Sequence, residues 1–186
     1  MFGFFRRKNQ DNQVAALYAS LVERSRNPSF YLFGNIDDTF DGRFELLSLH
    51  VHLILRALRS RGLGREEPGQ LLFDTFFQDM DQGLRESGVG DMGISKKIRR
   101  MAEAFYGRAA AYDNVMGDTP TQMDVLEVLT AMISKNFFDG QSCKGSAKTL
   151  AAYTINLDHL LSEANLDDIM SGQVLARDFD LEKVSP

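Results

Sequence analysis

This sequence contains a single cysteine, Cys143, and no tryptophan among its 186 residues. One cysteine excludes an intrachain disulfide and argues against a zinc site built on thiolates, which needs several cysteines. Such scarcity is typical of a protein that works in a reducing compartment. No apolar run reaches the roughly 20 residues that a helix needs to cross a bilayer. These absences argue against a disulfide scaffold, a zinc module and a membrane-spanning protein.

The common catalytic motifs are also absent. The chain has no Gly-x-Ser-x-Gly elbow, no Walker loop, no cysteine–histidine nucleophile pair and no Glu-x-x-His motif. Residues 88–91, GVGD, resemble a phosphate loop, but they follow a predicted helix rather than a strand, so we expect their glycines to serve a tight turn. The sequence therefore predicts no catalytic residues, no metal site and no cofactor.

Two sets of side chains contain residue types that can bind a metal ion. His50 and His52 lie two residues apart in one predicted helix, so they point about 200° apart and cannot share a ligand. At most one of them is expected to face the core. Asp74, Asp79 and Asp81 form an aspartate-rich helix of the kind that can hold magnesium and a diphosphate. They support an alternative function, a magnesium-dependent enzyme acting on a prenyl diphosphate or a quinone precursor.

Composition and periodicity indicate one all-α domain of six or seven helices. Hydrophobic residues make up 44% of the chain, enough for a core, and the net charge of −5 argues against general nucleic-acid binding. Apolar residues recur at helical spacing. We predict helices over residues 11–26, 43–61, 70–87, 96–116 with Ser95 as N-cap, 122–138 with Thr121 as N-cap, 147–164 and, briefly, 166–171. The second of these is apolar enough to lie near the centre, and residues 30–33 are expected to be irregular.

The two ends are expected to lie outside the helical domain of residues 11–172. Residues 1–10 are predicted to form a flexible amphipathic tail and residues 173–186 a loose one. The first tail has the wrong order for a secretory signal, because its apolar group precedes the basic one. It is either frayed or dips into an anionic membrane surface through Phe2, Phe4, Phe5, Arg6, Arg7 and Lys8.

The segment from Leu71 to Tyr112 is the most informative part of the chain. It combines apolar and basic side chains on two helices joined by a glycine-rich turn, and its candidate partner-binding residues are Phe73, Phe76, Phe77, Met80, Lys96, Lys97, Arg99, Arg100, Phe105 and Tyr106. The apolar members either line a groove for a client helix or belong to the core. The basic members begin a helix, where cations oppose the helix dipole, so either Asp79, Asp81, Glu86 and Asp91 compensate them or an anionic partner does.

Two stretches resemble the ubiquinol–cytochrome c chaperone family. They are RFELLSLHVHLILRALR (residues 43–59) and LFDTFFQDMDQGLRESGVGDMGISKKIRRMAEAFYGRAAAY (residues 72–112). The DMD, LRE, GVGD, KKI and FYGR elements occur in the family's order and with its spacing. The resemblance covers residues 28–165.

This resemblance implies an all-α fold, no enzymatic activity and a defined client. The family assists biogenesis of respiratory complex III by binding newly made cytochrome b near the ribosomal exit tunnel. In mitochondrial members a small partner protein completes the complex. Because this chain carries no transit peptide, we expect an α-proteobacterial member, located in the cytoplasm or at the cytoplasmic face of the inner membrane. The sequence leaves open the oligomeric state, any contact with haem or quinone, and the anionic partner of the basic residues.

Overall fold

All regular elements in the described part of the computed structural model are helical, and this part comprises residues 2–63, 67–118, 122–140, 144–176 and 181. The helices are α1 (Phe2–Ser25), α2 (Pro28–Leu32), α3 (Phe40–Ser60), α4 (Glu67–Glu86), α5 (Asp91–Asp118), α6 (Gln122–Phe138), α7 (Lys144–Glu163) and α8 (Leu166–Met170). The predicted all-α fold is confirmed. Six helices are long, and α2 and α8 have five residues each.

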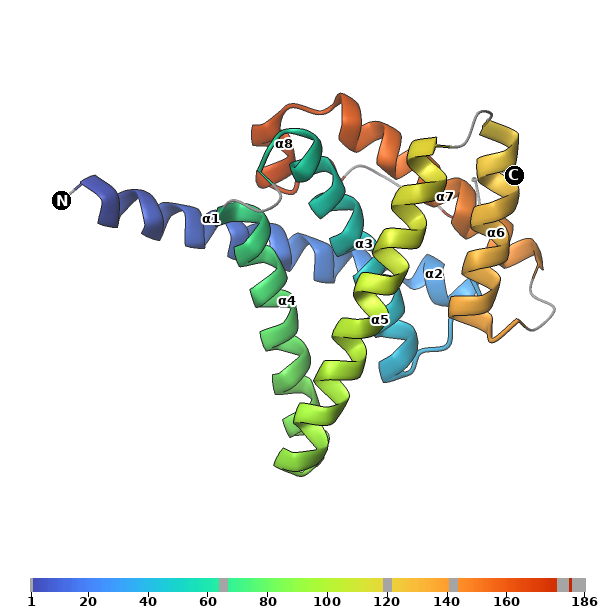
Figure 1. Cartoon of the computed structure of the whole chain (residues 1–186), viewed down its shortest axis with the longest axis horizontal. Helices are drawn as coiled ribbons and strands as arrows, with labels where there is room; N and C mark the ends of the chain where they lie inside the picture. Colours follow the sequence, from blue (N-terminus) through green and yellow to red (C-terminus); the bar gives the residue numbers. More distant parts are fainter. Residues whose placement is uncertain (1, 64–66, 119–121, 141–143, 177–180, 182–186) are drawn as a thin grey trace.

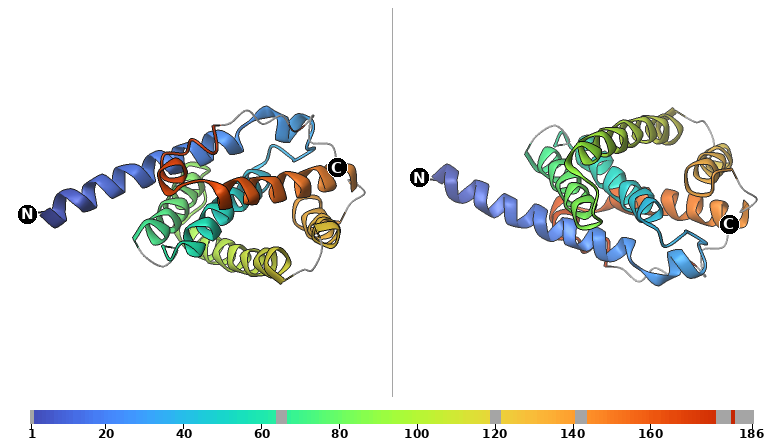
Figure 2. Two further views of the ribbon diagram at one scale, coloured as in Figure 1. Left: turned by 90° about the horizontal axis from the view of Figure 1, so that it is seen from above. Right: turned by 90° about the horizontal axis from the view of Figure 1, so that it is seen from below.

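Helix α3 occupies the centre of the domain, as its dense apolar sequence predicted. Thirteen of its 21 residues are buried. Helices α1, α4, α5, α6 and α7 all pack against it, approaching from different sides (Figures 1 and 2). Because α3 is enclosed around its circumference, His50 and His52 are both buried, with exposures of 0% and 2%. The expectation that at most one histidine faces the core was therefore wrong.

Several predicted boundaries moved for local reasons. Residues 30–33 were expected to be irregular, but most of them belong to α2. Pro28 ends α1 and also starts α2, because its fixed φ suits the first position of a helix and Asn27 caps the Ser29 N–H at 2.9 Å. Helix α3 starts at Phe40 rather than residue 43, since the Thr39 side chain accepts the Gly42 N–H at 3.1 Å.

The turn between α4 and α5 is shorter than predicted. Gly88 takes a φ of +82°, which ends α4, and α5 starts at Asp91. Ser95, the predicted N-cap, instead lies one turn inside the helix, where its hydroxyl is 3.4 Å from the Asp91 carbonyl. The proposed cap Thr121 lies outside the described residues.

Both ends of the chain also differ from expectation. Helix α1 begins at Phe2, nine residues before the predicted start, and its first half extends away from the rest of the domain (Figure 2). The predicted loose segment after Gly172 contributes to the core, since Val174, Leu175 and Leu181 are at most 3% exposed. Gly172 has a φ of +73°, and a Cβ there would lie 2.4 Å from the Ser20 hydroxyl. Only glycine permits this approach to α1.

A chain of buried hydrogen bonds joins α1, α3 and α7 through His50. Its Nδ1 lies 2.8 Å from the Leu46 carbonyl, which can only accept, so Nδ1 carries the proton. The Tyr153 hydroxyl then donates to Nε2 at 2.5 Å and accepts from Arg24 at 3.2 Å. The Ser25 hydroxyl lies 3.0 Å from Nδ1. Burial in this site lowers the pKa of His50 to about 3, so the imidazole is neutral at physiological pH.

His50→Leu is expected to reduce the free energy of unfolding by about 1–3 kcal/mol, because the buried hydroxyl of Tyr153 loses its acceptor. Urea denaturation of His50→Leu, Tyr153→Phe and the double variant measures the coupling. The double variant should lose less stability than the sum of the single variants, since removing both partners leaves fewer unpaired groups. Additive losses would contradict a direct interaction.

The lowered pKa of His50 also makes the stability of the protein depend on pH. Between pH 6.5 and 3 the unfolded chain binds a proton at His50 that the folded chain does not, so wild-type stability falls as the pH falls through this range. His50→Leu lacks this contribution. The stability difference between wild type and variant should shrink by up to about 1.4 kcal/mol per pH unit below pH 6.5. Urea titrations at neutral and acidic pH test this, and a constant difference would contradict it.

Candidate functional site

The α4–α5 hairpin carries the predicted site residues, and the structure divides them by exposure. Phe76 and Phe105 are fully buried and Met80 is 9% exposed, so these three belong to the core rather than to a surface. Phe76 stacks on Phe44 of α3 at 5.9 Å between ring centroids, with an angle of 8° between the rings. These contacts fasten the hairpin to the central helix.

Three aromatic side chains of the hairpin reach the surface. Phe73 and Phe77 are half-buried, and Tyr106 is 59% exposed. The Phe73 ring lies 4.7 Å from that of Phe77 and 5.3 Å from that of Tyr106. We call Phe73, Phe77 and Tyr106 the aromatic edge. Its packing on the buried Phe105 holds the rings in place, so an apolar surface is available without exposing the core.

In the described part of the protein, the basic residues near the start of α5 form no ion pair with the four acids that the sequence offered as partners. Asp81 and Asp91, two of the predicted internal partners, both accept from Arg85, at 2.6 and 2.8 Å. Lys97 lies 4.9 Å from the centroid of the Phe40 ring, a cation–π contact that fixes it against α3. Arg99 pairs with Glu103 on the surface at 3.0 Å.

The remaining predicted acids are also engaged elsewhere. Asp79 accepts a 2.7 Å hydrogen bond from the Tyr18 hydroxyl, and burial together with this carboxylate raises the pKa of Tyr18. The side chain of Gln82 donates to Glu86 at 2.9 Å. Of the two alternatives that the sequence left open, the described contacts do not support compensation of the basic residues by these four acids, because Arg85 pairs with both Asp81 and Asp91.

The aspartates do not converge on a metal. Asp74 accepts from Gln70 at 2.8 Å, so Asp74, Asp79 and Asp81 each have a different partner. No cluster of three or more potential ligands occurs among the described residues. The backbone of residues 2–8 forms the first turns of α1, but the side chains of the predicted membrane contacts Phe2, Phe4, Phe5, Arg6, Arg7 and Lys8 lie outside the described part of the structure. No described helix is long and apolar enough to cross a membrane.

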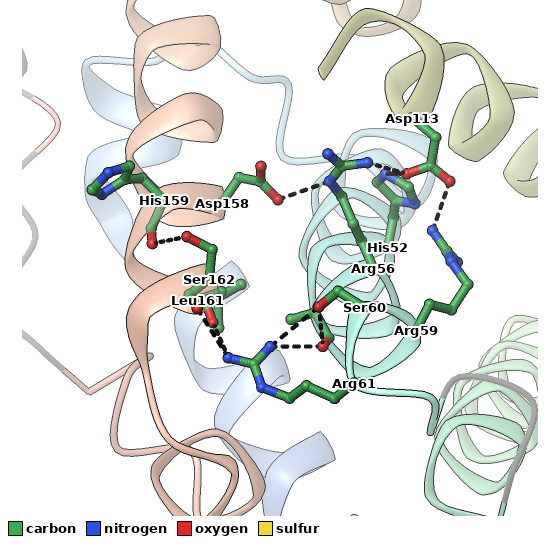
Figure 3. Close-up of polar contacts among 11 residues, drawn as sticks. His52, Arg56, Arg59, Ser60, Arg61, Asp113, Asp158, His159, Leu161 and Ser162 are labelled. Atoms are coloured by element: carbon green, nitrogen blue, oxygen red, sulfur yellow. Dashed lines mark hydrogen bonds and ion pairs between the residues drawn. The ribbon is translucent and has the colours of Figure 1, made fainter. Parts of the chain in front are cut away.

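A seam of ion pairs that the sequence analysis missed links α3, α5 and α7 (Figure 3). Asp113 of α5 accepts from Arg56 at 3.0 Å and from Arg59 at 2.6 Å. Arg56 also donates to Asp158 of α7 at 3.0 Å. The seam borders a cavity of about 360 Å³. The available signal was the spacing of Arg56 and Arg59, which places both guanidinium groups on one face of α3.

His52 lies behind this seam and stays neutral. Its Nε2 is 3.5 Å from Asp113, too far for a hydrogen bond, and neither ring nitrogen has a hydrogen-bond partner among the described residues. Burial lowers its pKa to about 4, although Asp113 raises it. Directly after α3, the side chain of Arg61 donates to the carbonyls of Leu161 and Ala164, at 3.0 and 2.7 Å, and so caps the end of α7. Polar contacts thus set the positions of α5 and α7 relative to α3.

With this geometry established, comparison with known proteins shows the family. A family model described as "Ubiquinol-cytochrome C chaperone" matches residues 34–177, most of the chain. This protein belongs to the ubiquinol–cytochrome c chaperone family. The match includes α3, the hairpin and the seam, so it confirms the resemblance that the hairpin motifs indicated.

Individual relatives agree with the family assignment. The chain is similar to ubiquinol-cytochrome c reductase complex assembly factor 1 of Mus musculus, with 26% identity over 87% of this chain and 54% of the mouse protein. It is also similar to the Xenopus laevis protein of that name, with 23% identity over 89% of this chain and 82% of the relative. The chain therefore spans about half the length of the mouse relative.

A solved structure shares the fold along its entire length. The crystal structure of the Cbp3 homolog from Brucella abortus superposes with a TM-score of 0.80 at 29% identity and covers 99% of both chains. The family is one of chaperones and assembly factors rather than enzymes. This finding argues against the alternative of a magnesium-dependent prenyl diphosphate enzyme, which depended on three aspartates that the structure assigns to separate partners.

Asp113→Ala is expected to reduce the free energy of unfolding by about 1–3 kcal/mol, since it leaves Arg56 and Arg59 without a shared carboxylate beside a buried helix. The lower part of this range applies if solvent screens the arginines, which are 25% and 40% exposed. Chemical denaturation measures the loss. Asp11→Ala on the exposed surface of α1 is the matched control, expected to stay within about 0.5 kcal/mol of wild type. Equal effects of both substitutions would contradict a structural role for the seam.

Proposed function

We propose that this protein is a non-enzymatic assembly chaperone that binds newly made cytochrome b and promotes biogenesis of respiratory complex III. The observation that carries the proposal is the family match over residues 34–177, together with the full-length similarity to the Brucella abortus Cbp3 homolog. The mouse and frog relatives are named as assembly factors of the ubiquinol-cytochrome c reductase complex. Cytochrome b as the client follows from the family resemblance of the hairpin motifs.

The aromatic edge gives this function a physical basis. An unassembled membrane protein presents apolar helices, and a chaperone must bind such a surface reversibly. Phe73, Phe77 and Tyr106 offer rigid rings with a polar hydroxyl at the rim, a composition that is enriched in protein interfaces. We propose that the aromatic edge contacts an apolar helix of cytochrome b. In this arrangement the basic residues of α5, Lys96, Lys97, Arg99 and Arg100, lie near the ends of the client helix or near the groups that surround it.

The place of action follows from the client. The family resemblance implies binding of newly made cytochrome b near the ribosomal exit tunnel, so we propose that the protein works there, at the cytoplasmic face of the inner membrane. Contacts of residues 2–8 with the anionic membrane surface belong to this proposal, because three phenylalanines followed by three cations are typical of interfacial segments. A small partner protein, as in mitochondrial members, is a further expected component.

Deleting the gene is expected to lower the amount of assembled complex III, which blue-native electrophoresis of membranes measures. Unchanged levels of the complex would refute the proposal. Affinity purification of the tagged protein from a native membrane extract should recover cytochrome b.

The same assay locates the client surface. Expression of Phe73→Ser/Tyr106→Glu in the deletion strain should recover little cytochrome b and restore less complex III than wild type, because a charge at the aromatic edge disfavours apolar contacts. Val128→Asp is the control, since Val128 is 44% exposed and belongs to α6 rather than to the hairpin. Loss of cytochrome b capture by the control alone would place the client surface elsewhere.

A further inference from the structure

The tip of the α4–α5 hairpin combines an exposed apolar side chain with unpaired cations. The hairpin extends beyond the other helices at the lower edge of Figure 1, and its turn connects Glu86 to Asp91. Met92, in the first turn of α5, is 93% exposed, more than any other large hydrophobic side chain in the described part of the protein. It packs against nothing there, so burial in this domain does not account for an apolar side chain at the apex.

The cations behind Met92 are Lys96 and Arg100. Lys96 and Arg100 are exposed and form no ion pair with any described residue. The nearby carboxylates Asp81 and Asp91 are held by Arg85. Lys96 and Arg100 are four residues apart, and like charges at that spacing on a helix repel each other. An arrangement that is unfavourable in the isolated domain becomes favourable against an anionic surface.

The spacing of these side chains matches the depth of a membrane interface. Met92, Lys96 and Arg100 follow one another at intervals of four residues, so they lie on the same side of α5. At about 1.5 Å per residue, the two cations lie roughly 6 and 12 Å behind the apolar apex. Apolar side chains of interfacial elements reach about 5–10 Å into the boundary between headgroups and acyl chains. Long cationic side chains would then lie among the lipid phosphates.

We infer that the hairpin tip is a docking surface for an anionic lipid bilayer, with Met92 entering the interface and Lys96 and Arg100 binding lipid phosphates. This surface is separate from the aromatic edge and from the start of α1. RNA is the other anionic partner, but single-stranded RNA is typically held by aromatic stacking, and the tip has no aromatic side chain between residues 85 and 100. An exposed methionine at the apex favours lipid.

Co-sedimentation of the purified full-length chain with vesicles tests this surface. We expect binding to vesicles of phosphatidylcholine mixed with phosphatidylglycerol and little binding to phosphatidylcholine alone. Lys96→Glu/Arg100→Glu should reduce the partition coefficient by about tenfold or more, and Met92→Ser by about threefold. The matched control is Lys135→Glu/Lys148→Glu, which makes the same charge change at exposed positions on α6 and α7 and should bind nearly as wild type does.

Each outcome supports or contradicts the docking of the hairpin tip on an anionic bilayer. Deletion of residues 2–8 removes the other candidate membrane segment, and the effect of Lys96→Glu/Arg100→Glu should persist in that background. Equal losses in the tip and control variants would show an effect of net charge only and overturn the proposal. Unchanged vesicle binding by the tip variant, with loss of binding to a ribosomal RNA fragment, would replace lipid by RNA. The assay contains no cytochrome b, so its result is independent of the chaperone assignment.

Discussion

The enclosure of α3 is the constraint on which the rest of this structure depends. A helix that is buried around its circumference cannot leave polar side chains to solvent, so each polar group that it carries needs a partner or must stay neutral. His50 meets this requirement through Leu46 and Tyr153, and His52 does so by losing its charge. Arg56 and Arg59 lie where α3 approaches the surface, and they bind carboxylates of the surrounding helices. The central helix thus sets the positions of its neighbours through polar contacts as well as apolar ones.

The α4–α5 hairpin shows how this arrangement exposes aromatic side chains on a packed base. Phe76 packs on Phe44 of α3 and on Phe105 of α5, and the Asp113 seam holds the distal part of α5. The hairpin's other end extends beyond the remaining helices (Figure 1). The proposed function requires a protein that offers apolar surface without unfolding or aggregating. A rigid edge of three aromatic rings on a well-packed base satisfies both requirements.

Much of the fold was accessible from local sequence signals. The six long helices and the central position of α3 follow from apolar periodicity, because helical spacing is a strong signal over 17 or more residues. The predicted helix boundaries were less accurate where a residue type is compatible with more than one position relative to a helix end. Pro28 both ends one helix and starts the next, and Ser95 suits a cap but lies inside α5. The buried residues Val174 and Leu175 were missed since their segment has no periodicity of its own.

For the candidate site too, some features follow from local sequence signals and others only from the packing of the helices. The sequence by itself determined the all-α class, the hairpin and the family, because these depend on periodicity and on the order of short motifs. Only the tertiary structure decided that Phe76, Met80 and Phe105 are core while Tyr106 is surface, since one helical stripe can face either a neighbour or solvent. It also decided that Arg85, rather than the basic cluster, takes Asp81 and Asp91. Charge pairing depends on side-chain distances across a turn, and no pattern along the chain encodes those distances.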